Sequence, residues 1–116
     1  MAPTIILDRK GDLFAVLGSP GASSIILYNV KAIVCLIDWA CSVEQAASLP
    51  TFGSRNGPVE VEAGTAAQTG LGTALTASGS TVTSVDMTSG LGIIERLGGH
   101  IEGAADPRRE GAALGD

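Results

Sequence analysis

The sequence predicts an α+β domain built from short strands and a few helices. Two nearly unbroken apolar runs, Thr4–Leu7 and Leu13–Leu17, are typical of strands that are covered on both faces. A long apolar stretch, Ser23–Cys41, follows a turn of glycine, proline and serine and predicts a helix. At 116 residues, the chain has the length of one domain. These observations together indicate a layered fold with a sheet inside it.

The first half of the chain carries clear signals for where elements begin and end. A polar segment with Gly11 joins the first two strands and predicts a hairpin. Either Ser23 or Ser24 can cap the long helix. Ser42 has the character of a cap for a short second helix, Val43–Ser48, which Pro50 stops.

The second half is richer in small residues and predicts mostly strands. Thr51–Pro58 contains several helix and strand breakers and is expected to be irregular. The expected elements are a strand at Val59–Glu62, a weak helix at Ala66–Ala77, and strands at Thr81–Met87, Leu91–Leu97 and His100–Glu102.

The predicted helix Ser23–Cys41 is apolar almost all round, so it needs a covering surface. Only Asn29, Lys31 and Asp38 interrupt it, and two charges argue against a membrane span. The mean hydropathy is +0.33 and only 16% of residues are charged. We therefore expect a protein partner on this helix, or self-association through it.

Charge and residue counts exclude several kinds of site. The net charge is −5 and no large basic cluster is present, which argues against nucleic acid as a partner. His100 is the only histidine, which argues against a zinc site or a Ser–His couple, and no metal or cofactor is expected. If the helix runs to Cys41, Cys35 and Cys41 lie about 9 Å apart, too far for a disulfide.

Several other residues that could carry chemistry are expected to have structural roles instead. Gly70–Gly72 and Gly90–Gly92 lack the third glycine of a dinucleotide-binding fingerprint. Five acidic residues are read as solvated or capping groups: Asp38, Glu44, Asp86, Glu95 and Glu102. The cluster Asp106–Arg109 is read as a surface turn held by a salt bridge, with substrate binding as the alternative.

The turn Gly18–Ser24 is the strongest candidate site. A strand-to-helix turn leaves the first helical N–H groups without internal partners at the positive end of the helix dipole, which makes a small anion site. On its own such a turn is a weak motif, and the simpler interpretation is that glycine and proline serve its geometry alone.

Three blocks in order change that interpretation. Met1–Asp8, Gly18–Ile26 and Gly103–Ala113 together resemble the C-terminal part of a γ-glutamyltransferase small subunit. The resemblance runs from end to end and is weakest between Thr51 and Ser80. It implies one incomplete domain over residues 1–116, part of the αββα sandwich of the N-terminal-nucleophile hydrolases, with a mostly antiparallel sheet and flanking helices.

The resemblance also implies a mechanism. In the family, an N-terminal threonine attacks the γ-glutamyl carbonyl, and the acyl group passes to water or to an amino acid or peptide. Gly21 and Ala22 match the two residues whose backbone N–H groups bind the oxyanion, and Ser19 and Pro20 match the adjoining substrate-binding turn. The nucleophile is expected outside this chain, so the implied partners are the rest of the small subunit, the large subunit and a γ-glutamyl substrate.

Departures from the family pattern leave other functions open. Ala22 replaces a glycine and would be strained at a positive φ, and Ser24 stands where an arginine is usual. A sibling acylase acting on glutaryl-cephalosporins or poly-γ-glutamate is one alternative. A non-catalytic remnant that serves as a structural or interaction module is another. Family members are often periplasmic, secreted or membrane-anchored, but the compartment of this chain is not indicated.

Overall fold

The computed structural model describes residues 1–115, and its contacts divide these residues into two compact units. The first consists of Met1–Leu49 and the segment that begins at Thr88. The second is Pro50–Met87, which includes the whole region where the resemblance is weakest. The mixed α+β class predicted from the sequence is confirmed.

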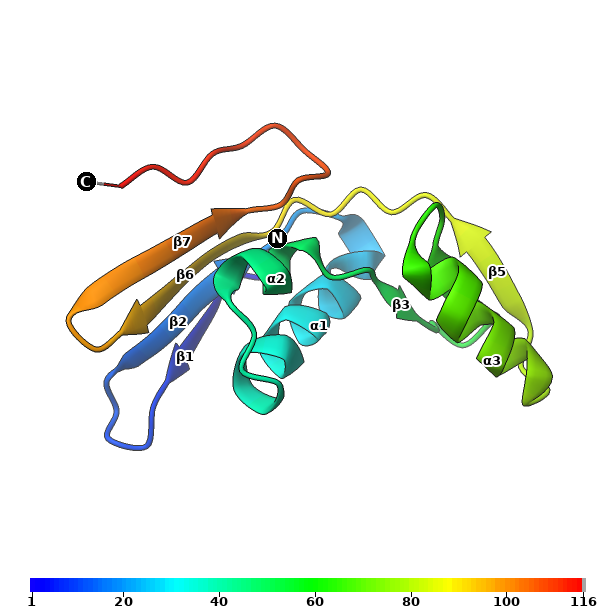
Figure 1. Ribbon diagram of the computed structural model, residues 1–116, viewed down its shortest axis with the longest axis horizontal. Coiled ribbons are helices and arrows are strands. Elements are labelled where there is room, and N and C mark those ends of the chain that lie inside the picture. The colour runs from blue at the N-terminus through cyan, green and yellow to red at the C-terminus, as the bar shows by residue number, and fades with distance from the viewer. Residues whose placement is uncertain (116) are drawn as a thin grey trace. The chain divides into compact units, whose positions relative to one another are not determined.

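A four-stranded antiparallel sheet forms the first unit (Figure 1). Its strand order is β1-β2-β6-β7, and the strands are β1 (Thr4–Leu7), β2 (Leu13–Gly18), β6 (Gly92–Leu97) and β7 (His100–Ala105). The register pairs Leu17 with Ile93 and Ile93 with Ala104. These three side chains are buried and lie on one face, because side chains alternate along a strand.

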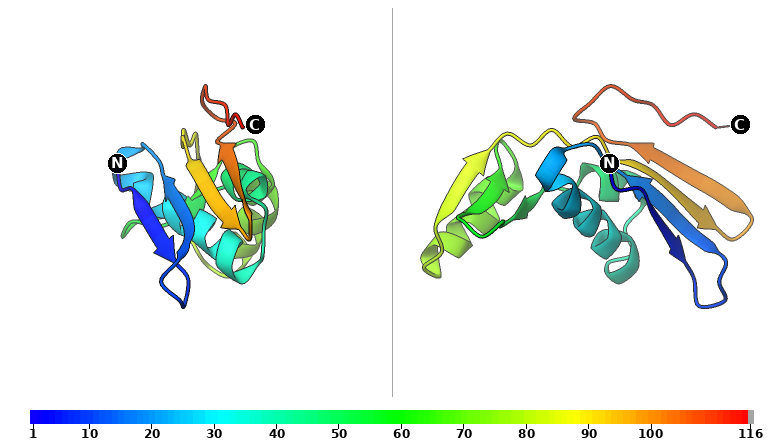
Figure 2. Two further views of the ribbon diagram at one scale, coloured as in Figure 1. Left: turned by 90° about the vertical axis from the view of Figure 1, so that its left-hand side faces the viewer. Right: turned by 180° about the vertical axis from the view of Figure 1, so that it is seen from behind.

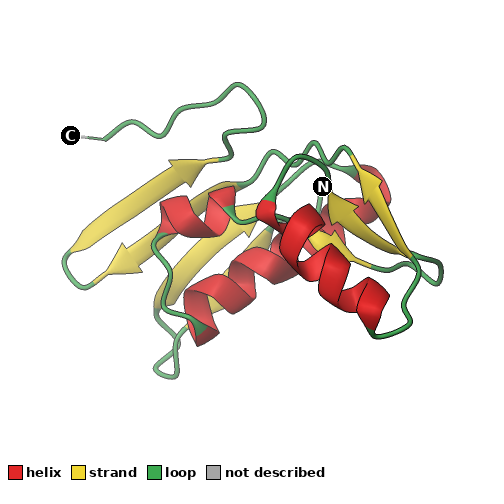
Figure 3. Ribbon diagram, turned by 45° about the vertical axis from the view of Figure 1, so that its right-hand side comes forward, coloured by secondary structure: helices red, strands yellow, loops and turns green. Residues whose placement is uncertain are grey.

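Helices cover that face of the sheet. A short 3₁₀ turn, η1 (Ala22–Ser24), leads into α1 (Ile25–Asp38), which is followed by α2 (Val43–Ser48). α1 packs against β2, and α2 packs against β6 and β7. Both helices lie on the same side of the sheet (Figures 2 and 3). The core of this unit is therefore aliphatic, with Tyr28 of α1 as its one aromatic ring.

The helix-free face of the sheet is apolar and open. Ile5, Val16 and Ile94 lie directly opposite one another on adjacent strands, and Ile101 lies on the same face of β7. Ile5 is 68% exposed, Ile94 49% and Ile101 69%. Along α1, the side chains of Ile26, Val30 and Ile37 are exposed as well. The apolar surface that the hydropathy predicts is thus distributed over a sheet face and one stripe of α1.

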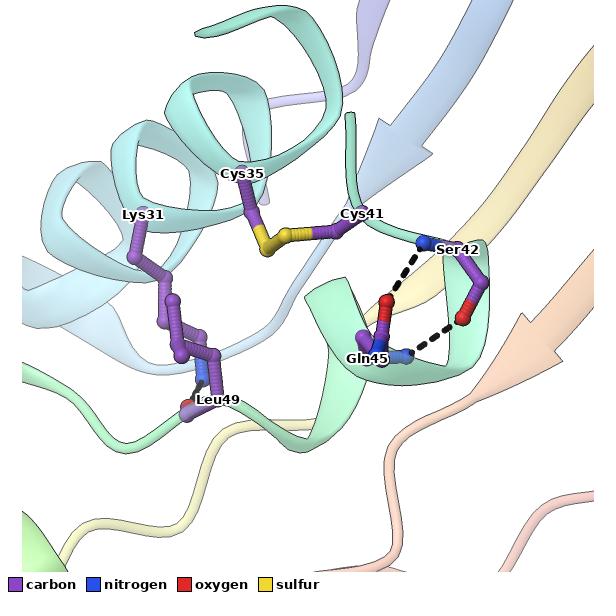
Figure 4. The surroundings of a disulfide bond; sticks show 6 residues. All are labelled: Lys31, Cys35, Cys41, Ser42, Gln45 and Leu49. Carbon is purple, nitrogen blue, oxygen red and sulfur yellow. Dashed lines mark hydrogen bonds between the residues drawn. A yellow bond between two sulfur atoms is a disulfide. The ribbon is translucent and has the colours of Figure 1, made fainter. Parts of the chain in front are cut away.

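The end of α1 differs from the prediction. The helix stops at Asp38 because Ala40 takes a left-handed φ of 50°, and the Cys41 N–H turns back to donate to the Cys35 carbonyl (3.0 Å). The Cα atoms of Cys35 and Cys41 are then 5.3 Å apart, and the two residues form a disulfide (Figure 4). The prediction that they are too far apart was wrong, because Cys41 lies beyond the helix.

The start of α2 agrees with the prediction. Ser42 Oγ accepts a hydrogen bond from the Gln45 N–H, and Gln45 Oε1 accepts one from the Ser42 N–H (Figure 4). This capping box satisfies two N–H groups that a helix leaves free. The disulfide and the capping box lie on successive residues, so together they fix where α2 begins.

The second unit is a small three-stranded sheet with one helical layer (Figure 3). Its elements are β3 (Phe52–Gly53), β4 (Val59–Glu62), a π-helical turn η2 (Ala67–Leu71), α3 (Gly72–Ala77) and β5 (Val82–Val85). β4 pairs antiparallel with β3 and parallel with β5. Gly70 and Gly72 therefore lie in a helical segment, and Gly72 is buried against Val61 and Val82. Among residues 1–115, none of the helices has the length and apolar character needed to cross a membrane.

Candidate functional site

The turn between β2 and α1 has an unusual backbone. Gly21 has φ 143° and ψ 21°, and Ala22 has φ 50°. A Cβ added to Gly21 would lie 2.4 Å from Cε2 of the buried Tyr28 ring, so only glycine fits there. Ala22 has the positive φ that the sequence analysis identified as strained.

Two N–H groups of this turn point to no acceptor in the part of the chain that the structure describes. The Ser24 N–H donates to the Gly21 carbonyl at 3.0 Å. Within residues 1–115, neither the Gly21 nor the Ala22 N–H donates a hydrogen bond. Gly21 is half-buried and Ala22 is exposed, and both precede α1, whose dipole is positive at this end. Adjacent free donors at a helix N-terminus can bind a negatively charged oxygen.

The Ser19 side chain is buried and hydrogen-bonded within the protein. The residue is 0% exposed; its hydroxyl donates to the Pro20 carbonyl (2.8 Å) and accepts from the Gly90 N–H (3.0 Å). Because Ser19 is fully buried, a direct contact of this hydroxyl with a substrate would require the turn to open. Pro20 is half-buried, with its ring against Gly90. Substrate binding by Ser19 and Pro20 therefore stays a prediction.

Asp106 is buried, which corrects its interpretation as part of a surface turn. It is 3% exposed, and its Oδ1 lies 3.0 Å from Nη1 of Arg108. The other oxygen, Oδ2, accepts from Ser89 Oγ (2.5 Å) and the Leu91 N–H (3.2 Å). Burial alone would raise the pKa of Asp106, but the hydrogen bonds from Ser89, Leu91 and Arg108 together hold this pKa below its ordinary value.

Glu95 also differs from the solvated carboxylate that the sequence suggested. It lies on the helix-covered face of β6, is 5% exposed and pairs across the strands with Glu102 of β7. Burial, with a smaller contribution from the charge of Glu102, raises the pKa of Glu95. The cause was not visible in the sequence, because the alternation of β6 assigns Glu95 to the inner face only once the sheet register is known.

Other potential sites are weaker. No group of three or more His, Cys, Asp or Glu side chains within residues 1–115 is arranged to hold a metal. An open groove of about 930 Å³ runs between the helix-free sheet face and residues 112–115. Gly18 and Gly90 line it, but Gly21 and Ala22 do not. The groove and the two free N–H groups are therefore separate features of the first unit.

Sequence reasoning found the turn but missed its support. Ser89 and Leu91 are far from the turn in sequence and have no motif of their own. Their contacts with Asp106 span 17 and 15 residues. The available signal was that Asp106 lies in the third block of the resemblance, Gly103–Ala113, but an aspartate there is more often exposed than buried.

The chain as a whole matches a known family and known structures. The sequence pattern of the gamma-glutamyltranspeptidase family matches residues 1–116. A search of curated proteins gave no significant match. A point mutant of gamma-glutamyltranspeptidase from Helicobacter pylori superposes with a TM-score of 0.84 at 28% identity, over 94% of this chain and 61% of that chain.

Two further structures show the same fold. Gamma-glutamyltranspeptidase from Pseudomonas nitroreducens, complexed with L-DON, has a TM-score of 0.87 at 23% identity, over 100% of this chain and 62% of that chain. The Bacillus anthracis transpeptidase CapD has a TM-score of 0.74 at 18% identity, over 100% of this chain and 70% of that chain. These matches confirm the predicted Ntn-hydrolase fold class, an α+β fold of antiparallel sheet and flanking helices.

The relatives extend beyond the matched region. This sequence spans about three-fifths of the Helicobacter and Pseudomonas chains. The family match nevertheless covers all of the sequence given, residues 1–116. The chain therefore belongs to the gamma-glutamyltranspeptidase family.

Proposed function

We propose that this chain is part of a γ-glutamyltransferase and that the Gly21 and Ala22 N–H groups form its oxyanion hole. The observation that carries the proposal is the pair of adjacent N–H groups that find no acceptor within residues 1–115. They lie at the positive end of α1, and the backbone that presents them is held in a conformation with two successive positive φ values.

The chemistry follows from charge development at the substrate carbonyl. Attack of a nucleophile on the γ-glutamyl carbonyl moves an electron pair onto its oxygen, and two fixed donors stabilise the resulting oxyanion. Collapse of this intermediate breaks the γ-glutamyl amide bond, the amine of the donor leaves with a proton, and the acyl-enzyme remains. Water or the amine of an amino acid or peptide then attacks the acyl-enzyme, takes the γ-glutamyl group and releases the nucleophile. The threonine nucleophile, with its own α-amine as base, lies outside residues 1–116 in this proposal.

The partners in this proposal are the remaining small-subunit segment and the large subunit. The matched Helicobacter chain is longer than this one, which supports a requirement for further protein. Residues 1–116 alone are then expected not to hydrolyse a γ-glutamyl anilide, because the oxyanion turn lacks a nucleophile beside it.

The sharpest test replaces single N–H groups by oxygen in the complete enzyme. Glycolic acid in place of Gly21, or lactic acid in place of Ala22, exchanges the amide for an ester and removes one donor without adding a side chain. We expect each ester to lower kcat by about 100-fold with little change in KM. Gly21→Pro would remove the same donor, but proline needs a φ of about −65° and Gly21 has 143°, so it would also break the turn.

Ala40 provides a matched control. It has the same φ of 50°, its N–H also donates no hydrogen bond within residues 1–115, and it follows α1 at the opposite end. Lactic acid at position 40 should leave kcat unchanged. Equal turnover in all three esters would remove Gly21 and Ala22 from the site.

The acyl donor is tested separately. A panel of glutathione, a glutaryl-cephalosporin and poly-γ-glutamate distinguishes a γ-glutamyltransferase from a sibling acylase. A complete native product that cleaves none of them would favour the non-catalytic module.

A further inference from the structure

A buried polar network connects the candidate oxyanion turn to the C-terminal end of α2. Asp106 lies at its centre, directly after β7. Its Oδ1 accepts from the Arg108 N–H and from Arg108 Nη1, both at 3.0 Å. Its Oδ2 accepts from Ser89 and Leu91, as described above. Each carboxylate oxygen therefore has two donors inside the protein, which leaves Asp106 without capacity for a substrate.

On one side, the network holds α2. Arg108 Nη1 donates to the Ala47 carbonyl and Nη2 to the Ser48 and Leu49 carbonyls, each at 3.2 Å. These carbonyls belong to the last turn of the helix and lack helical partners, and a guanidinium there also complements the helix dipole. Lys31 of α1 donates to the Leu49 carbonyl as well (Figure 4). The end of α2 is thus tied to Asp106 through Arg108.

On the other side, the network reaches the turn. Gly90 lies between the two residues that Asp106 holds, and its N–H donates to Ser19 Oγ at 3.0 Å. A Cβ on Gly90 would lie 3.1 Å from Cγ of Pro20, so the segment and the turn are in close contact. Arg109 adds a second tie, because its Nε donates to the Thr88 carbonyl at 2.9 Å.

We propose that Asp106 is a positioning residue for the Gly18–Ser24 turn, acting through Ser89, Leu91 and the Gly90–Ser19 hydrogen bond. This inference rests on the proposed function only for its effect on turnover. Ser19 precedes Pro20, whose φ is fixed by its ring, and the next two residues carry the two N–H groups, so anchoring Ser19 restricts where these groups point. Fixed donors stabilise an oxyanion better than mobile ones, because no reorganisation is needed as charge develops.

The test compares the complete enzyme with its Asp106→Asn variant. The NH₂ group of the new side-chain amide is a donor and cannot accept a hydrogen bond. In one orientation of the side chain this group faces the Leu91 N–H, and in the other it faces the donors of Arg108. Either way the network loses hydrogen bonds, while the volume of the side chain stays the same. We expect kcat per titrated active site to fall about tenfold and KM to change by less than about twofold. We also expect faster amide hydrogen exchange in peptides that cover residues 18–24 and 88–91.

The route through Ser19 is tested by a double-mutant cycle. Ser19→Ala removes the hydroxyl that accepts from the Gly90 N–H and donates to the Pro20 carbonyl. If Asp106 acts through this bond, the Ser19→Ala, Asp106→Asn double variant should lose no more activity than the worse single variant. Should Asp106→Asn fail to fold, Ser89→Ala removes one of the four bonds to the carboxylate, and the same readouts decide.

Arg55→Met is the matched control. It breaks an arginine–carboxylate pair with Glu60 (3.2 Å) that is exposed and lies in the second unit. Turnover and exchange in residues 18–24 should stay unchanged in this variant.

The outcomes separate the two proposals. Unchanged kcat and exchange in Asp106→Asn would overturn the positioning role, and so would a loss of kcat without faster exchange in residues 18–24. The complete wild-type enzyme could also lack γ-glutamyl activity, which would overturn the proposed function. Faster exchange in its Asp106→Asn variant would still support the positioning role.

Discussion

Ala22 has a backbone conformation that suits glycine better than alanine. Its φ is 50°, and a left-handed φ costs a residue with a Cβ roughly 1–2 kcal/mol. Alanine keeps the N–H that the proposed oxyanion hole needs. In this chain, alanine at position 22 therefore keeps the donor and costs stability.

Ala22→Gly should stabilise the first unit. We expect the free energy of unfolding to rise by about 1 kcal/mol, because the strain at positive φ is relieved, and kcat of the complete enzyme to stay the same. Urea denaturation of the chain measures the first and steady-state kinetics the second. Ala40→Gly, at an equal φ, should give a similar gain in stability. A loss of stability in Ala22→Gly, as alanine-to-glycine changes in helices give, would contradict the strain.

The raised pKa of Glu95 predicts that the stability of the first unit depends on pH. Its pKa is raised in the folded state, so the neutral carboxyl is favoured by folding; this contribution is fully present below the unfolded pKa and is lost as pH rises through the folded value. Glu95→Gln should therefore raise the melting temperature at pH 7 and leave it unchanged near pH 4. Thermal unfolding across this range, with Glu44→Gln on the exposed surface of α2 as control, measures the difference. A gain of equal size at both pH values would assign the effect to packing instead.

At the scale of elements, most of the fold was predictable because the signals were local. β1, β4 and α2 have the predicted bounds, since apolar runs, alternation and a capping serine each act over a few residues. The end of α1 was not predictable, because a left-handed alanine leaves no mark in the sequence. The disulfide was missed for the same reason.

In the candidate site too, one part could be predicted from the sequence and another could not. The turn could be identified from its glycine, proline and serine residues and from the resemblance. Its support through Asp106 could not, because burial of that carboxylate depends on contacts with Ser89 and Leu91 that only the folded sheet brings together. Glu95 was misjudged for a related reason: the register of β6 against β2 and β7 decides which face it occupies.

The disulfide should contribute to the stability of the α1–α2 connection. For a loop this short, removal of the cross-link is expected to cost about 2 kcal/mol, since it frees the unfolded chain. The Cys35→Ala, Cys41→Ala double variant, compared with the oxidised protein by urea denaturation, measures this cost. Reduction of the wild type by a phosphine should produce a similar loss, whereas the double variant should not respond to the reductant. A wild type that is insensitive to reduction would contradict a stabilising role.

At the scale of the whole molecule, the first unit has two apolar surfaces that a partner can cover. One is the helix-free sheet face around Ile94, and the other is the stripe of α1 that contains Ile26. Two associations are proposed, and they differ in the surface that they use. The rest of the enzyme would cover the sheet face, and a second copy of the chain would pack against α1.

Two matched substitutions distinguish these surfaces. Ile94→Lys should prevent assembly of the complete enzyme if the sheet face is covered, because burying an unpaired ammonium is unfavourable. Ile26→Lys should instead abolish a dimer that forms through α1. Size-exclusion chromatography with light scattering measures both. Normal assembly and turnover in Ile94→Lys would show that the sheet face stays open to water.

The link between Cys35 and Cys41 also bears on where the protein can mature. Such a bond forms and persists in oxidising compartments such as the periplasm, the endoplasmic reticulum lumen or the extracellular space, whereas cytosolic thiol systems keep cysteines reduced. Both cysteines of residues 1–116 are in this bond, so the oxidised form of this segment carries no free thiol. Material made in a reducing compartment would be a different covalent species from oxidised material, and a recombinant preparation should be checked for the mass of the two hydrogens that the disulfide lacks before its stability or activity is compared.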